Sequence, residues 1–323
     1  MKKYGLLIVL SMSTIVASCQ HNVVEVPAVI SIESSTVKEH LITLASDEME
    51  GRRAGTPGIE KAARYIENEF EEIGLGTFKG LETYRQNFEE NGLQLFNVIG
   101  VLEGKSKKDE YVVVSAHYDH LGMKNDGIGD QIFNGADDDA SGVSAVLTLA
   151  KYFAKMGTNE RTVLFVAFTA EEMGMLGSKY FGEGIDPSKY VAGINIEMIG
   201  KESKFGPKTA WLTGFERSDF GKIIQKNLEG TDYTLYPDPY INYNLFFRSD
   251  NASLARLGIP SHTFSTGPID ADIHYHQVTD EVETLNMEVI TETIRAIALG
   301  TETIINVIDT PSRVTIKQKK AKK

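Results

Sequence analysis

The sequence predicts an α/β fold in which a doubly wound, mostly parallel central sheet is flanked by helices as a three-layer sandwich. Four apolar runs are strand-like and show almost no polar alternation: 95–102, 111–116, 162–168 and 191–196. Strands of this kind are buried on both faces, as in a parallel sheet covered by helices. Helical segments alternate with these runs along the chain, which is typical of a doubly wound sheet.

The helical segments follow from the spacing of their apolar residues. Between Thr56 and Gly74, apolar residues recur every three or four positions, and the Thr-Pro pair at the start and the glycine at the end are typical helix boundaries. The same reasoning predicts helices over 37–48, 141–156, 218–228 and 287–308. Short strands are expected at 210–212 and 259–264, and a tyrosine-rich loop at 233–243.

The chain of 323 residues shows no repeat, internal linker or composition break between residues 37 and 309. We therefore expect one catalytic domain over 37–309, since a single core of that size is common. Residues 19–36 are expected to be a tether. Residues 310–323 form a basic tail that we expect to be disordered.

The amino end has the pattern of an export signal. Two lysines precede an apolar stretch that is too short to span a bilayer as a mature helix, and small residues follow it. Val16-Ala17-Ser18-Cys19 resembles the bacterial lipobox, in which the cysteine is lipidated after removal of residues 1–18. We therefore expect a membrane-anchored lipoprotein that faces the periplasm or the cell exterior; ordinary secretion is the alternative. Cys19 is the only cysteine, so a disulfide within the chain is excluded.

The charge balance bears on the partners. The chain has 33 basic and 45 acidic residues, a net charge of -12. Such an acidic field repels phosphate backbones, so nucleic acid is not an expected partner. It favours the approach of cations, and the free amino terminus of a peptide is one.

Polar side chains gather where the expected strands end. His117 follows the second apolar run, Glu171 and Glu172 follow the third, and Glu197 follows the fourth, while Asp138 precedes a helix. Ligands in an open α/β sheet bind outside the carboxyl ends of the strands. Carboxylates brought together there need a cation. Imidazole and carboxylate ligands suit zinc, with manganese or cobalt as lesser options.

Five motifs in order give a more specific interpretation. They are His117-Tyr118-Asp119, Asn134-Gly135-Ala136-Asp137-Asp138-Asp139-Ala140-Ser141-Gly142, Thr169-Ala170-Glu171-Glu172-Met173-Gly174, Asn195-Ile196-Glu197-Met198 and His274-Tyr275-His276-Gln277. Together they resemble the secreted co-catalytic zinc aminopeptidases, whose superfamily includes bacterial leucyl aminopeptidases, glutamate carboxypeptidase and the glutaminyl cyclases. The resemblance runs from about residue 44 to about residue 285. It implies a zinc aminopeptidase-like sandwich and an exopeptidase that acts on peptides with a free amino terminus.

The resemblance also implies a role for each motif. Two Zn²⁺ ions per chain are expected to share a water, lower its pKa and polarise the scissile carbonyl. Glu171 is implied as the general base, and Asp119 as the carboxylate that orients the first histidine. The implied metal ligands are His117, Asp138 as the bridge, Glu172, Glu197 and His276.

Other residues near these motifs have simpler interpretations. Asp137 and Asp139 are expected to be capping or turn residues. His120 and His274 are not expected to be ligands, because the spacing of His276 to Thr279-Asp280 fits the family better. The candidates for binding substrate or stabilising the oxyanion are Tyr240, Tyr243 and Arg248.

Two positions depart from the family pattern. The family usually has aspartate where Glu197 stands, so occupancy of one metal site is less secure. Arg248-Ser249-Asp250-Asn251 resembles a Ser-Asp-His segment whose histidine is replaced, which leaves substrate preference open.

Three rival functions remain at this point. A glutaminyl cyclase-type transferase shares the fold but usually uses one zinc, whereas the full ligand set here favours two. A catalytically inactive binding relative would not need Glu171. A peptidase family with a similar order of ligands carries a lid domain, and the interval from Glu197 to His276 is too short for one.

Overall fold

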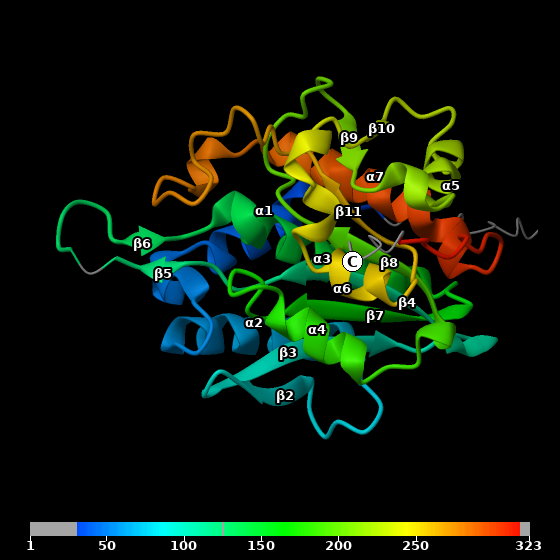
Figure 1. The fold of residues 1–323 in the computed structure, drawn as a ribbon, viewed down its shortest axis with the longest axis horizontal. Coiled ribbons are helices and arrows are strands. Elements are labelled where there is room, and N and C mark those ends of the chain that lie inside the picture. The colour runs from blue at the N-terminus through cyan, green and yellow to red at the C-terminus, as the bar shows by residue number, and fades with distance from the viewer. Residues whose placement is uncertain (1–30, 125, 317–323) are drawn as a thin grey trace, which may run out of the picture.

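The computed structural model describes residues 31–124 and 126–316, and their core is a nine-stranded mixed sheet (Figure 1). The strand order is β1-β3-β7-β4-β8-β11-β9-β10, and β2 also pairs with β3. The strands are β1 Gly76–Thr77, β2 Arg85–Glu90, β3 Leu93–Leu102, β4 Lys107–His117, β7 Arg161–Phe168, β8 Tyr190–Ile196, β9 Thr209–Leu212, β10 Thr234–Pro237 and β11 Ser261–Ser265.

The four central strands, β7, β4, β8 and β11, are paired in parallel. Val114 of β4, for example, lies opposite Phe165 on one side and Ile194 on the other. Antiparallel pairs occur toward both edges, where β3 joins β7 and β9 joins β11. Every residue of β7 is buried, as its apolar sequence predicted. The α/β fold class with a parallel central sheet is confirmed.

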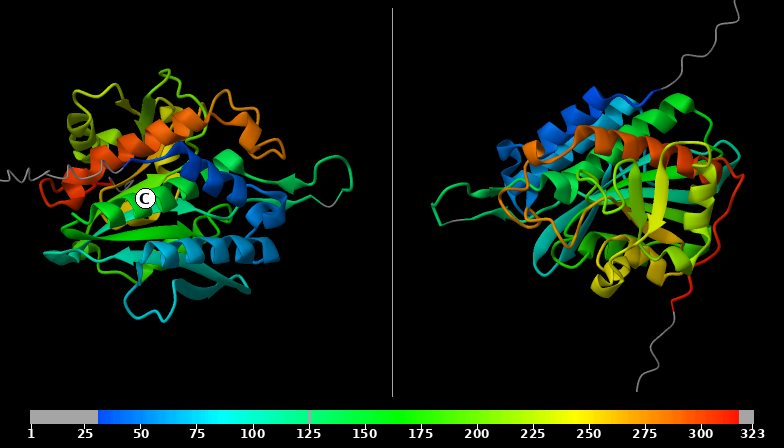
Figure 2. Two further views of the ribbon diagram at one scale, coloured as in Figure 1. Left: turned by 180° about the vertical axis from the view of Figure 1, so that it is seen from behind. Right: turned by 90° about the horizontal axis from the view of Figure 1, so that it is seen from above.

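Helices cover both faces of the sheet (Figure 2). The left view of Figure 2, seen from behind, shows α2, α3 and α7 together on one face of the sheet, and contacts join α1 and α5 to this layer. The opposite face carries α4 and α6, which contact each other and pack on a separate apolar cluster. The helices are α1 Ser34–Leu44, α2 Pro57–Ile73, α3 Gly142–Met156, α4 Leu176–Glu183, α5 Phe220–Asn227, α6 Asn251–Arg256 and α7 Met287–Ile305.

Helix α2 shows how the sequence specifies these elements. Pro57 occupies the first turn, where its missing N–H costs nothing. The apolar stripe that includes Ile59, Ala63 and Phe70 is buried against the core. Gly74 then adopts a left-handed conformation with φ 83° and donates its N–H to the Phe70 carbonyl, which ends the helix.

Several short elements of the fold are not evident from the sequence. Strand β2 and the short helices α4 and α6 have too few residues to show a clear period. The tyrosine-rich segment expected to be a loop contains strand β10, and α1 ends at Leu44 and is followed by a 3₁₀ turn over Asp47–Arg52. A small hairpin of β5 (Gly122–Met123) and β6 (Ile132–Phe133) projects from the body of the domain (Figure 1).

The domain extends beyond the boundaries expected at both ends. Ile32, assigned to the tether, is buried, and its carbonyl accepts a hydrogen bond from Arg295 at 3.1 Å. Val314, assigned to a disordered tail, is buried and donates its N–H to the Gly258 carbonyl. Apolar side chains at 32 and 314 therefore belong to the core. The signal segment, Cys19 and residues 317–323 lie outside the described residues.

Within the described ranges, no helix is both long enough and apolar enough to cross a bilayer.

Candidate metal centre

The expected ligands and the expected base come together at the carboxyl ends of the central strands. One histidine is the last residue of β4, the paired glutamates follow β7, and the third glutamate follows β8. The aspartate lies in the turn before α3, and the last histidine lies in the loop after β11. The residues brought together are His117, Asp138, Glu171, Glu172, Glu197 and His276.

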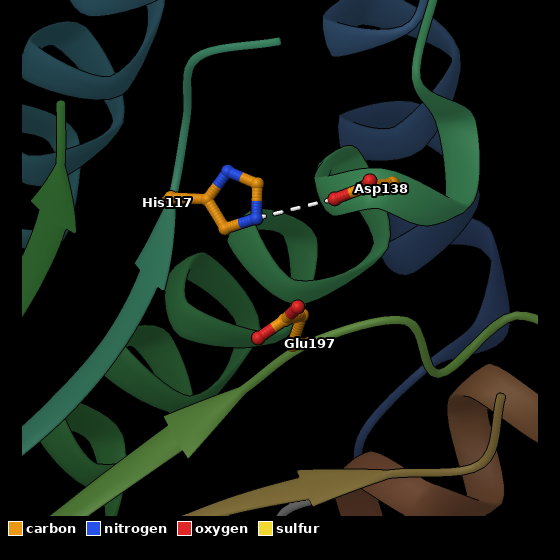
Figure 3. Close-up of side chains that lie close together, drawn as sticks. All are labelled: His117, Asp138 and Glu197. Carbon is orange, nitrogen blue, oxygen red and sulfur yellow. Dashed lines mark ion pairs between the residues drawn. The ribbon is translucent and has the colours of Figure 1, made fainter. Parts of the chain in front are cut away.

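A first group of ligand atoms consists of His117, Asp138 and Glu197 (Figure 3). One ligand atom from each lies within 4.8 Å of the others, and His117 Nε2 is 3.2 Å from Asp138 Oδ1. Two ligands at zinc distances in tetrahedral geometry lie roughly 3.4 Å apart. His117 Nε2 is buried and has no hydrogen-bond partner among the described residues. The spacing and the unpartnered nitrogen fit a bound divalent cation.

A second group surrounds the other oxygen of the same aspartate. His276 Nε2 lies 3.2 Å from Asp138 Oδ2 and 3.3 Å from Glu172 Oε1. These distances again match the spacing of ligand atoms on one zinc ion, roughly 3.4 Å. His274, by contrast, bonds through Nδ1 to the Thr279 hydroxyl at 2.9 Å. The geometry therefore gives Asp138 one oxygen in each group.

His120 also reaches this second group, contrary to expectation. Its Nδ1 lies 3.0 Å from Glu172 Oε1 and 4.0 Å from Asp138 Oδ2. The side chain is buried, and its ring meets the His276 ring edge to face at 5.8 Å. The sequence did carry one signal, since His120 is only three residues from His117 in the same loop. Without the path of that loop, the direction of its ring could not be predicted.

Asp119 connects the histidine loop to the glutamate loop. The resemblance implied that its carboxylate orients His117, but the Asp119 main-chain carbonyl is the partner of His117 Nδ1, at 3.1 Å. The nearest carboxylate oxygen is 3.8 Å away. The carboxylate instead accepts the backbone N–H groups of Glu171, at 3.0 Å, and Glu172, at 3.3 Å. Burial raises the pKa of Asp119 to about 6.

Asp137 and Asp139, which flank Asp138, accept hydrogen bonds from backbone N–H groups through their side chains, in agreement with the expected turn and capping roles. Asp139 accepts the N–H of Gly142 at the start of α3, at 3.0 Å, and the N–H of Met198, at 3.2 Å. Asp137 accepts the N–H of Gly200 at 2.7 Å. These bonds fix the turn that carries Asp138 against the segment that follows β8.

Gly135 allows this turn to approach the histidine loop. It adopts a left-handed conformation with φ 55°. A Cβ at this position would lie 2.3 Å from the Asp138 carbonyl oxygen and 2.6 Å from the His120 ring. No other residue type therefore fits here without moving a candidate ligand.

Arg52 is a buried cation behind the site, and the sequence analysis did not identify it. Its Nε donates to the Tyr118 carbonyl at 3.0 Å, and its two terminal nitrogens donate to the carbonyls of Asn134, at 2.6 Å, and Gly135, at 2.9 Å. The side chain is completely buried. A single guanidinium thus joins the loop after β4 to the turn before α3.

The carboxylates of the site strongly affect one another. Burial raises the pKa of Glu171 well above its ordinary value, and the charges of Glu197 and Asp250 add to that shift. Burial alone would lower the pKa of His117, but the neighbouring carboxylates raise it well above the usual range. Such a concentration of negative charge is stable when cations bind to it.

A cavity opens directly over these groups. Its apolar wall includes Trp211, Leu245 and Ile269, and Glu171 and Glu197 line its acidic side. Of the three expected substrate residues, Tyr243 and Arg248 line the cavity. Tyr240 does not: it is buried, and its ring packs edge to face against Trp211 at 5.6 Å.

Tyr275 is a further cavity residue whose role the sequence analysis did not identify. Its ring stacks on the ring of His276 with 3.9 Å between centroids.

Residues 97–300 match the sequence model of peptidase family M28. The chain belongs to this family. Aminopeptidase YwaD of Bacillus subtilis is 24% identical over 185 residues, which cover 56% of this chain and 33% of that protein. Leucine aminopeptidase 1 of Leptosphaeria maculans is 28% identical over 211 residues, which cover 59% of this chain and 51% of that protein. The match therefore spans about a third to a half of these two M28 relatives.

Solved structures show the same fold. The zinc aminopeptidase BSAP of Bacillus subtilis has a TM-score of 0.71 at 14% identity, covering 89% of this chain and 99% of that one. The LapA aminopeptidase of Legionella pneumophila has a TM-score of 0.67 at 21% identity, covering 85% and 72%. The glutaminyl cyclase of Porphyromonas gingivalis also has a TM-score of 0.67, at 17% identity, covering 85% and 99%. Membership of M28 confirms the resemblance to zinc metallopeptidases.

Proposed function

We propose that this M28 protein is an aminopeptidase that uses two zinc ions to hydrolyse the first peptide bond of peptides with a free amino terminus. One observation carries the proposal: Asp138 contributes one oxygen to each of two ligand groups at the floor of one cavity. Clusters of carboxylate and imidazole ligands of this kind suit zinc. Family membership supports the same chemistry.

Each ion would be held by residues from different segments of the chain. We assign His117, Asp138 and Glu197 to the first ion, and Asp138, Glu172 and His276 to the second. When bound, the ions would lower the pKa of a water and polarise the scissile carbonyl. His120 fits best as a residue that orients Glu172, because its Nδ1 lies at hydrogen-bond distance from that carboxylate and farther from Asp138.

Glu171 is the proposed general base. It lines the cavity beside the ligand residues, and Asp119 holds its backbone N–H. A carboxylate so placed takes a proton from the attacking water and returns it to the leaving amine.

The oxyanion of the reaction needs a hydrogen-bond donor near the ligands. We assign this role to the Tyr275 hydroxyl, since Tyr275 lines the cavity and stacks on His276. Tyr243 also lines the cavity and remains a substrate contact. Tyr240 is dropped from the expected set because it is buried and does not line the cavity.

Glu197, where the family usually has aspartate, has its own support. Burial raises the pKa of Glu197, and the nearby Ser249 hydroxyl opposes that shift, so it lies within reach of the carboxylate. Asn195 donates to that hydroxyl oxygen at 2.8 Å, and Ser115 in turn donates to Asn195 at 2.8 Å. This chain of polar groups restrains the longer side chain. We therefore propose that glutamate is a competent ligand here.

The decisive experiment measures metal content and cleavage of aminoacyl arylamides by the wild type and by Glu171→Gln. We expect two zinc ions per chain in both proteins, and a loss of about 10²- to 10⁴-fold in kcat for the variant. Two bound ions without cleavage of any aminoacyl substrate would refute the aminopeptidase. One bound ion together with cyclisation of an amino-terminal glutamine would instead favour a glutaminyl cyclase.

We also propose that the protein is an exported lipoprotein, with Cys19 as its lipidated first residue. The basic and apolar start of the chain and the lipobox-like Val16-Ala17-Ser18-Cys19 support this. Fractionation of cells that express the wild type or Cys19→Ala tests it. The wild type should sediment with membranes, and the variant should not carry an acyl chain by mass spectrometry. A wild type without acyl groups would refute the anchor.

A further inference from the structure

Arg248 is the only lysine or arginine among the residues that line the cavity. It follows the 3₁₀ turn Leu245–Phe247, and its side chain is exposed. Within the described ranges, the guanidinium makes no hydrogen bond, ion pair or contact with an aromatic face. Its cation is therefore free to bind a ligand and has no evident role in holding the fold.

The neighbours of Arg248 show which side of the cavity it serves. Burial raises the pKa of Tyr275, and the positive charge of Arg248 opposes that shift, so the two side chains lie within electrostatic reach. Thr213, which also lines the cavity, accepts the N–H of Thr263 at 3.0 Å through its hydroxyl oxygen. Its hydroxyl hydrogen has no acceptor in the described part of the chain, so it is a second donor for a ligand.

The charges of the cavity indicate the chemistry of that ligand. Four carboxylates line it: Asp138, Glu171, Glu172 and Glu197. Two divalent cations would balance these four charges, and Arg248 would remain as the cationic side chain among the described residues of the lining. A guanidinium presents a planar fork of donors that matches a carboxylate. The apolar wall of Trp211, Leu245 and Ile269 can cover the hydrocarbon part of the same ligand.

We propose that Arg248 forms a carboxylate-binding subsite, so that the enzyme prefers substrates with a carboxylate beside the scissile bond. That carboxylate is either the side chain of an amino-terminal aspartate or glutamate, or the free α-carboxylate of a dipeptide. The inference rests on the proposed aminopeptidase activity and adds a substrate class to it. Arg248 is here a binding residue and takes no part in proton transfer.

Matched substrate pairs test the subsite. Glutamyl and glutaminyl p-nitroanilide differ only in a side-chain carboxylate, and Leu-Ala and Leu-Ala-amide differ only in the α-carboxylate. We expect the wild type to favour the carboxylate member of one pair. In Arg248→Gln, the ratio of kcat/KM values within that pair should fall by about 10- to 100-fold, since a charge-assisted hydrogen bond is lost. Arg248→Lys should keep part of the ratio.

Arg256→Gln is the matched control, because Arg256 is an exposed arginine that does not line this cavity. The control should keep the wild-type ratio in both pairs. No preference in the wild type, or an equal loss within each pair in Arg248→Gln, would overturn the subsite. The pair that responds identifies the source of the carboxylate.

A binding measurement separates this inference from the activity. The carboxylate member of one pair, glutamate against glutamine or Leu-Ala against Leu-Ala-amide, should raise the Tm of the zinc-loaded wild type more than its partner does, and Arg248→Gln should remove the difference. If the wild type cleaves no substrate, the aminopeptidase proposal fails, while these two Tm comparisons still decide whether the subsite binds a carboxylate. Equal shifts with both amino acids, and no pair preference, would refute the subsite alone.

Discussion

The carboxylate of Asp119 accepts the backbone N–H of Glu171 at 3.0 Å. The main-chain carbonyl of the same aspartate lies 3.1 Å from His117 Nδ1. Asp119 thus bonds to a candidate ligand through its backbone and to the candidate base through its side chain. The loops after β4 and β7 are positioned as one unit.

Replacing Asp119 by asparagine should alter the positions of Glu171 and Glu172 more than that of His117, because His117 bonds to the main-chain carbonyl of residue 119. An amide keeps one acceptor oxygen but presents an N–H₂ group to the other backbone N–H. We expect zinc affinity to fall by about 10- to 100-fold, as for other groups that orient ligands. Calorimetric zinc titration of the metal-free protein measures this change. Unaltered affinity and unaltered kcat would show that the two bonds are dispensable.

His120 should matter for one ion and not the other. His120→Ala removes the nitrogen 3.0 Å from Glu172 Oε1, so one of the two zinc equivalents should lose about 10- to 100-fold in affinity. His120→Asn can place an amide N–H near the position of Nδ1 and should restore most of the affinity. His274→Ala is the control, since His274 bonds to Thr279. Equal zinc binding by all four proteins would exclude an orienting role.

Arg52 should be a strong determinant of stability. Arg52→Met leaves the buried carbonyls of Tyr118 and Asn134 without this donor, and the Gly135 carbonyl keeps only the N–H of Ala140. Each buried group left unpaired costs about 1–3 kcal/mol, so we expect a loss of roughly 3–5 kcal/mol in the free energy of unfolding. Urea denaturation of the metal-free protein measures it. Arg53→Met, at the exposed neighbouring position, should change stability by less than about 1 kcal/mol.

His262 should make stability depend on pH. Burial lowers the pKa of His262 to about 4, and the ring bonds the Ser218 hydroxyl at 2.7 Å and the Thr213 carbonyl at 2.8 Å. The unfolded histidine, with a pKa near 6.5, takes up a proton as the pH falls through that value, whereas the folded one stays neutral. The folded state therefore loses about 2 kcal/mol from this group between pH 7 and pH 5.

Denaturation of the wild type and His262→Gln at both pH values tests this relation. Glutamine cannot take up a proton, so the variant should lose about 2 kcal/mol less stability than the wild type over this interval. The comparison uses only the change with pH, because the substitution itself also alters packing. An identical change in both proteins would contradict the prediction.

The site residues whose positions depend on the order of the strands were the ones best predicted from the sequence. His117 ends a buried strand, Glu171 and Glu197 each follow one, and parallel strands carry their carboxyl ends to one edge. The direction of a side chain in a loop depends instead on contacts that are distant in the sequence. The His120 ring is one example, and Arg52, whose partners are as many as 83 residues away, is another. Tyr240 is a third example, because its ring packs against Trp211 and does not line the cavity.

Asp138 belongs to both ligand groups, one oxygen to each, so the two ions that we propose would not bind independently. The first ion to arrive would immobilise the carboxylate and present its second oxygen to the other position with less loss of side-chain entropy. The two cations would also repel each other, and the shared negative charge offsets part of that repulsion. Binding of the second zinc ion should therefore be stronger if the smaller loss of side-chain entropy dominates, and weaker if the repulsion between the cations dominates. In both cases, the measured binding constants belong to the pair of ions and not to either site alone.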